Sequence, residues 1–285
     1  RPAATWLGFF GGGLAVARSA GGLLSSTQHL GRAERAARAL TQWRSSWLAR
    51  EGVAAVIAFV PIAIFGGGWV FFNDTGGLFA VMGAVAAVMA LVTVSCTAMI
   101  YASLKPIRQW RSALVLPGYL VFGLMTGAVL LVLVALLFGV YRPTFAGLAL
   151  TLLAVGWAIK TAYWRSIDSR PAQSTLATAA GLGASGAVRL LEMPHTEANF
   201  LMQEMGYRIA RKHALRLRLL THLLLFAAPM ALLALIVLGA LPTTGLAVAA
   251  AILATISAGV GIVTERWLFF AEARHSSMLY YGQPA

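Results

Sequence analysis

Apolar residues gather in seven long runs, and polar residues fill the connections between them. The runs lie at about residues 5–28, 52–73, 77–102, 114–140, 144–163, 218–240 and 244–268. A helix needs about 20 apolar residues to cross the hydrocarbon core of a bilayer. Because every run reaches that length, the pattern predicts an all-α fold, a polytopic integral membrane helix bundle with seven spans that forms one domain over residues 1–285.

Glycine and proline mark the short turns between these runs, at Gly76, Gly77, Pro143, Pro242 and Gly245. Two more prolines, Pro61 and Pro229, lie inside runs and are expected to kink their helices. The glycine runs at 11–13 and 66–68 would let neighbouring helices approach closely. The sequence starts at Arg1, so we expect a further span, the eighth, to be missing upstream.

The connection between the first two runs has a different pattern. Residues 29–51 read HLGRAERAARALTQWRSSWLARE, with apolar residues every three or four positions and five arginines mostly on the opposite side. A basic amphipathic helix with tryptophans on its apolar face lies in the membrane interface and does not span the membrane. We therefore predict an interfacial helix over residues 30–50, with His29 at its start and Glu51 just beyond its end.

The charge of the chain is distributed unevenly between the two sets of connections. Of the 22 lysines and arginines, 18 fall on one side of the predicted bundle and two on the other. The positive-inside rule makes the basic side cytoplasmic, which predicts a multi-pass membrane protein with its basic connections in the cytoplasm. The net charge of +13 is explained by this topology, so nucleic acid is not expected as a partner.

Composition excludes several other classes of protein and cofactor. The chain is 59% hydrophobic and only 11% charged, which does not fit a soluble globule. The single cysteine, Cys96, cannot form a disulfide within the chain or hold an iron–sulfur cluster, and no metal site is predicted. A b-type haem is not expected either, because no pair of histidines lies deep in two spans; His222 sits just inside one.

The connection at 165–217 is long for a bundle of otherwise tight turns. Its first part, to residue 186, is expected to be extended, and residues 187–191 could form a short strand. Thr196 could cap a helix that runs toward the next span. We predict a cytoplasmic docking loop for a soluble subunit, with basic contacts from Arg208, Arg211, Lys212, Arg216 and Arg218.

Ionisable residues at the span boundaries are candidates for quinone chemistry. His29 and Glu51 could place an imidazole and a carboxylate at one headgroup-level pocket, where they would exchange protons with a quinone ring. Further candidate members are Arg18, Arg44, Glu265 and Arg266. The alternative is structural: His29 ends a helix, Glu51 pairs with Arg50 or Arg44, and the cluster at 265–275 is a solvated, salt-bridged helix end.

Two motifs resemble those of the membrane anchor subunits of the dimethyl sulfoxide reductase family. They are HLGRAERAARALTQWRSSWLARE and ERWLFFAEARHSSMLYYG, and the resemblance covers essentially the whole chain. It implies an anchor for a molybdopterin catalytic subunit and a four-cluster ferredoxin-like iron–sulfur subunit, exchanging electrons with quinone without a haem of its own. His29 and Glu51 match the histidine and glutamate that are implicated in quinol binding in that family.

The predicted topology refines this resemblance. A cytoplasmic 29–51 segment favours relatives whose catalytic subunits are cytoplasmic, and the anchor of sulfite dehydrogenase (sulfite:quinone oxidoreductase) is the best match among them. The chain would then pass electrons from the iron–sulfur subunit to ubiquinone or menaquinone. The alternatives are a quinol-oxidising anchor of a reductase and a transporter. A transporter is disfavoured because the ionisable residues gather at one membrane face rather than at the midplane.

Overall fold

The structure is a computed structural model of the chain, and it describes residues 2–27, 38, 40–169, 175–183, 188–189, 191–192, 208–274, 276 and 279. Seven helices among these residues are long and apolar enough to cross a membrane, as the sequence predicted. The first span is built from α1 (Pro2–Leu7), η1 (Gly8–Gly12) and α2 (Gly13–Thr27). It is followed by α4 (Trp47–Phe71), α5 (Gly77–Ala102), α6 (Val115–Leu137) and α7 (Pro143–Asp168).

The remaining elements follow the long connection. They are the short helices α8 (Leu176–Ala179) and α10 (Arg208–Lys212), then a composite span of α11 (Ala214–Thr221), η3 (His222–Ala227) and α12 (Ala228–Val237), and last α13 (Thr244–Ala271). Two turns end their preceding helices in the same way. Gly139 and Gly239 adopt positive φ angles of 67° and 65°, and the next residue's N–H bonds back to the final helical turn.

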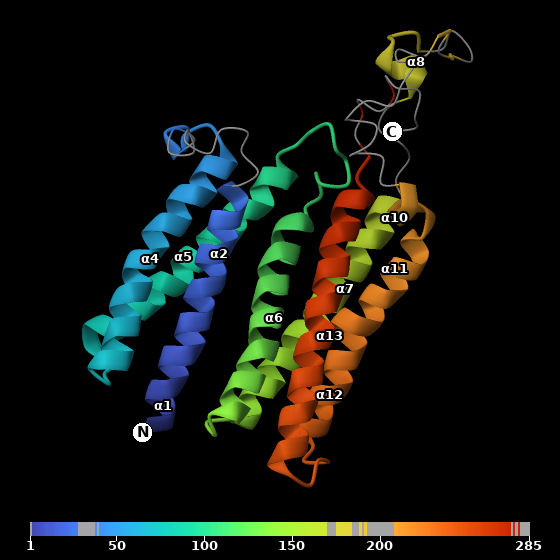
Figure 1. Cartoon of the computed structure of the whole chain (residues 1–285). Coiled ribbons are helices and arrows are strands. Elements are labelled where there is room, and N and C mark those ends of the chain that lie inside the picture. The colour runs from blue at the N-terminus through green and yellow to red at the C-terminus, as the bar shows by residue number, and fades with distance from the viewer. Residues whose placement is uncertain are drawn as a thin grey trace.

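The core lies in a four-helix unit made of α6, α7, the composite span and α13 (Figure 1). Met125, Leu153, Leu225, Phe226 and Leu233 are fully buried there. The hairpin of α4 and α5 packs beside this unit through α6, and the first span lies against α4. Because α5 has no buried residue in its most apolar stretch, much of its surface is left for lipid or a partner.

Pro229 changes the hydrogen bonding of the composite span. Proline has no N–H, and the residues before it form a π-helix, in which each N–H would bond five residues back. The carbonyl five residues before Pro229 belongs to Leu224, and it accepts a hydrogen bond from Ser257 Oγ of α13 at 2.8 Å. The expected distortion is therefore present and is stabilised by the neighbouring helix, while α4 runs through Pro61 as one helix.

Glycine allows close helix approach, but at fewer positions than the glycine runs suggest. A Cβ on Gly68 would meet the Phe79 ring of α5, whereas Gly66 and Gly67 face open space. In the first span the close approach is made by Gly8, where a Cβ would lie 2.8 Å from the Trp69 indole.

Two connections differ from their predicted structure. The interfacial helix does not continue to residue 50, because residues 41–45 form turns in which Thr41 and Ser45 bond to nearby backbone carbonyls. These side-chain bonds compete with a helix, and Ser46 then caps the start of α4. Residues 28–37 and 39 lie outside the described residues.

In the 165–217 connection, Thr175 caps the one-turn helix α8 where an extended chain was expected. Residues 188 and 189 are irregular, and the rest of the suggested strand and the helix after Thr196 lie outside the described residues.

Candidate functional site

The ionisable side chains of the spans gather at one end of the bundle, which is the end with the basic connections. This end holds the starts of α4, α6 and α11 and the ends of α5, α7 and α13, as the helix directions in Figure 1 show. The connection at 103–114 crosses it, and Trp110 donates a hydrogen bond to the carbonyl of Phe269 at 2.9 Å. The predicted gathering of charge at one membrane face is therefore present among the described residues.

Glu51 lies in the first turns of α4, where Ser46 accepts a hydrogen bond from the N–H of Ala49 at 3.4 Å. The Glu51 carboxylate accepts a hydrogen bond from Thr97 Oγ1 of α5 at 2.7 Å. Among the described residues, no cationic group lies within 4.0 Å of this carboxylate. Glu51 is thus a half-buried acid held toward α5 by a hydroxyl, with part of its hydrogen-bonding capacity still available.

The arginines next to Glu51 have other contacts. Arg50 donates to the carbonyls of Trp43 at 2.8 Å and Arg44 at 2.7 Å, and its guanidinium lies 4.2 Å from the centre of the Trp47 ring. Arg44 lies over the Trp43 ring. The structural alternative, in which Glu51 pairs with Arg50 or Arg44, is therefore not what the structure shows. Arg44, which the sequence suggested as a further member of the pocket, forms no ion pair with Glu51 among the described residues.

Glu265 and Arg266 belong to a buried triad completed by Lys160 of α7. Lys160 Nζ and Arg266 Nε each lie 2.5 Å from a different oxygen of the Glu265 carboxylate. The exposed fraction is 0% for the Glu265 side chain, 3% for Lys160 and 26% for Arg266. The predicted alternative of a solvated helix end is wrong for Glu265, since this carboxylate is salt-bridged but fully enclosed.

Sequence reasoning left Lys160 without a role. A lysine inside an apolar span is costly unless it meets an anion, and Glu265 stands near the same end of a different span. A lysine and a glutamate near the same end of two different spans could therefore have indicated an ion pair between them. Two cations and one carboxylate leave the triad with one net positive charge in an apolar setting, so the triad favours negative charge in its vicinity.

An aromatic cluster connects the triad with the Glu51 region. Arg266 lies over the Tyr119 ring, 4.3 Å from its centre, and Tyr119 stacks on Tyr101 with 6.0 Å between ring centres. Tyr101 is on α5, one turn after Thr97, whose hydroxyl binds the Glu51 carboxylate. Tyr101 therefore stands between the two charged groups.

A second network ties the helix ends together nearer the surface. Arg218 of α11 donates to Glu272 at 2.6 Å and to both oxygens of Asp168, the last residue of α7, at 2.6 and 3.0 Å. Glu272 also accepts from the Trp164 indole at 3.0 Å. Because Asp168 is 56% exposed, this network reaches the surface, and its contacts hold α7, α11 and the end of α13 in place.

The other predicted residues divide into three groups. His29 and His275 lie outside the described residues. Arg18 is exposed on α2, and no ion pair joins it to Glu51 in the described part of the chain. His222 accepts a hydrogen bond at Nδ1 from Trp157 at 2.8 Å. The expectation that the chain binds no haem stays a prediction.

The residues predicted to dock a partner differ in their contacts and exposure. Arg211 donates to the carbonyls of Ala271 and Ala273, both at 2.9 Å, and Arg218 is committed to the network described above. Lys212 and Arg216 are exposed. Two of the predicted docking contacts are thus internal ties of the bundle, and these two exposed cations are left for a partner. The side chain of Arg208 lies outside the described part.

Comparison with known proteins places the chain in a family. The sequence pattern of the family described as DMSO reductase anchor subunit (DmsC) matches residues 18–282. A sulfite dehydrogenase subunit of Allochromatium vinosum is 32% identical over 277 residues, which cover 93% of this chain and 82% of that protein. No solved structure matches. With this match over nearly its whole length and with seven apolar helices among the described residues, the chain is a multi-pass membrane protein that belongs to the family of DMSO reductase anchor subunits.

Proposed function

We propose that this chain is the quinone-reducing anchor subunit of a complex that resembles sulfite dehydrogenase. Electrons would originate at a molybdopterin subunit that oxidises sulfite, pass through a four-cluster ferredoxin-like iron–sulfur subunit, and reach ubiquinone or menaquinone in the membrane. Family membership and the similarity to a sulfite dehydrogenase subunit support this proposal. The 18 basic residues on one side favour partner subunits on the cytoplasmic face of a bacterial inner membrane.

The observation that carries the quinone site is the Glu51–Thr97 pair at the basic end of the bundle. Reduction of a quinone to a quinol takes two electrons and two protons, so an acid near a ring oxygen is needed to supply protons. Glu51 fits that task, because it is half-buried and is not neutralised by a described cation.

The buried triad supports the same placement. Electrons that arrive near Glu51 add negative charge before protons follow, and a fixed positive charge stabilises it without rearrangement. Arg266 carries such a charge, and the stacked rings of Tyr119 and Tyr101 lie between it and the Glu51 region. Glu265 and Lys160 hold Arg266 in position. In this proposal Glu51 delivers protons, and Arg266 acts electrostatically from a distance. Lys212 and Arg216 would contact the iron–sulfur subunit.

The decisive experiment is Glu51→Gln in the assembled complex. Quinone reduction should slow about tenfold or more, the scale for losing one proton-transferring group, while sulfite oxidation with a soluble electron acceptor stays unchanged. Asp74→Asn is the matched control, since it makes the same acid-to-amide change in an exposed turn at the other end of α4. Normal quinone kinetics in Glu51→Gln would reject Glu51 as a member of the site.

A second candidate function is the reverse reaction, in which the pocket oxidises quinol and sends electrons to a reductase. The match to the DMSO reductase anchor family favours it. The two candidates separate in one preparation of the complex: sulfite-driven quinone reduction supports the first, whereas quinol-driven reduction of dimethyl sulfoxide without sulfite oxidation supports the second.

A further inference from the structure

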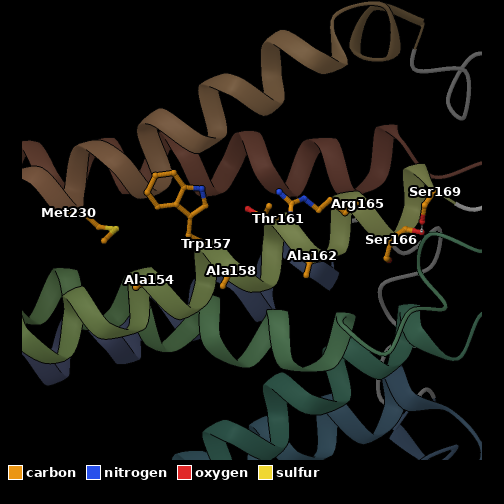
Figure 2. Close-up of a pocket in the computed structure, with 9 residues that line it drawn as sticks. All are labelled: Ala154, Trp157, Ala158, Thr161, Ala162, Arg165, Ser166, Ser169 and Met230. Carbon is orange, nitrogen blue, oxygen red and sulfur yellow. Dashed lines mark hydrogen bonds between the residues drawn. The ribbon is translucent and has the colours of Figure 1, made fainter.

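A groove of roughly 880 Å³ runs along α7 on the side of α12, away from Glu51 and the triad. Figure 2 shows its lining residues in a row along α7, from Met230 and Ala154 at one end to Ser166 and Ser169 at the other. The lining changes in character along this row. The inner end is apolar, with alanines, Trp157 and Met230, and the outer end has Thr161, Arg165 and two serines.

We infer that this groove, which we call the α7 groove, binds one phospholipid with an anionic headgroup. Its length supports a lipid of one leaflet. From Ala154 to Ser169 is 15 residues, which at about 1.5 Å per residue gives about 22 Å. Half of a bilayer, with its headgroup layer, is about 20–22 Å thick. An acyl chain would therefore lie on the apolar end while its headgroup reaches the polar end.

The charge at the outer end selects the headgroup. Arg165 is exposed in the last turn of α7, and no described carboxylate lies within 4.0 Å of it. Asp168, one turn further, does not repel an anion strongly because Arg218 binds both of its oxygens. Arg165 is thus the charge that faces the groove, and a phosphate-bearing headgroup is its natural partner.

The serines at the same end add hydrogen-bonding capacity. The Ser166 hydroxyl is buried and has no hydrogen-bond partner in the described part of the chain, although helical serines commonly bond to a carbonyl one turn back. Ser169 Oγ donates to the Ser166 carbonyl at 3.3 Å and remains open as an acceptor for a headgroup hydroxyl. Glycerol-based headgroups offer both phosphate oxygens and hydroxyls, which match this arginine–serine end.

The test uses native mass spectrometry of the full chain, purified in a mild detergent with equal amounts of phosphatidylglycerol and phosphatidylethanolamine of identical acyl chains. We expect one phosphatidylglycerol to be retained in preference to phosphatidylethanolamine. Arg165→Gln should weaken that retention about fivefold, which corresponds to about 1 kcal/mol for one arginine near an anionic lipid. Arg111→Gln should not, because this exposed arginine lies at the same end but outside the groove.

A second pair of variants tests the apolar part of the groove. Ala158→Leu fills the groove and should lower retention of the lipid, whereas Ala231→Leu, on an exposed face of α12 outside the groove, should leave it unchanged. Circular dichroism of each variant checks that the helices remain folded. Equal retention of the two lipids by the parent protein, equal loss in both arginine variants, equal binding in both leucine variants, or a quinone at the mass of the bound molecule would each overturn the inference.

Discussion

Removing the carboxylate of Glu265 should destabilise the bundle more than any other single charge removal in the two networks. Glu265→Gln keeps the shape of the side chain but leaves Lys160 and Arg266 as two neighbouring cations without their shared anion. At an effective dielectric constant of about 20, each 2.5 Å contact supplies roughly 6–7 kcal/mol of Coulomb attraction. Desolvation of the charges offsets most of that gain, but loss of one partner from a buried pair costs about 3–5 kcal/mol.

The measurement is the thermal unfolding midpoint of the purified protein in detergent. A loss of about 3–5 kcal/mol corresponds to a decrease of roughly 6–20 °C, at about 2–4 °C per kcal/mol. Asp168→Asn makes the same chemical change at a carboxylate that is 56% exposed, where an ion pair contributes about 0–1 kcal/mol, so its midpoint should fall by less than about 4 °C.

Lys160→Met gives an internal check on the reasoning. It removes one cation but leaves Glu265 paired with Arg266, so no buried charge is left unpaired. Its midpoint should fall less than that of Glu265→Gln. Equal shifts for Glu265→Gln and Asp168→Asn, or a larger shift for Lys160→Met, would show that the triad is not held together by the shared carboxylate.

Two further predictions concern topology and helix packing. Reporter fusions at Arg111 and Asp74 should place these residues on opposite sides of the membrane, with Arg111 cytoplasmic; a periplasmic signal at Arg111 would reverse the topology and remove the support for cytoplasmic partners. Gly261→Ala should lower the unfolding midpoint, because its Cβ would lie 2.6 Å from a backbone Cα of η3, and such overpacking costs about 1–3 kcal/mol. Gly259→Ala is the control, since its Cβ meets nothing within 4 Å, and an unchanged midpoint in both variants would contradict the close packing.

The spans could be predicted from sequence because bilayer thickness fixes the length of an apolar helix, whatever its neighbours are. The segment at 41–45 was predicted wrongly for a local reason. Its apolar spacing fitted a helix, but Thr41 and Ser45 bond to nearby carbonyls and Ser46 caps a new helix. Periodicity counts apolar positions and does not register this competition from hydroxyl side chains.

Glu51 and Glu265 could be picked out from the sequence as candidate site residues, because they are ionisable groups at span boundaries, where a carboxylate can exchange protons with a quinone. Their partners depend on how each helix is rotated about its axis, which an apolar run does not specify. Arg50 illustrates this: it is next to Glu51 in sequence, yet its guanidinium contacts carbonyls of the preceding turn, whereas Thr97 of another helix meets the carboxylate.

Polar contacts between apolar helices therefore fix the rotations in this bundle. Leucine and valine surfaces pack almost equally well at several rotations, and between spans there is no water whose release would choose one of them. A buried ion pair tolerates few arrangements, because a misplaced charge in the apolar interior is costly. Lys160–Glu265 fixes α7 against α13, and Arg218 fixes α11 against both through Asp168 and Glu272. The same contacts hold Arg266 over the Tyr119 ring, so the residues that set the packing of the bundle also set the electrostatics beside the proposed quinone site.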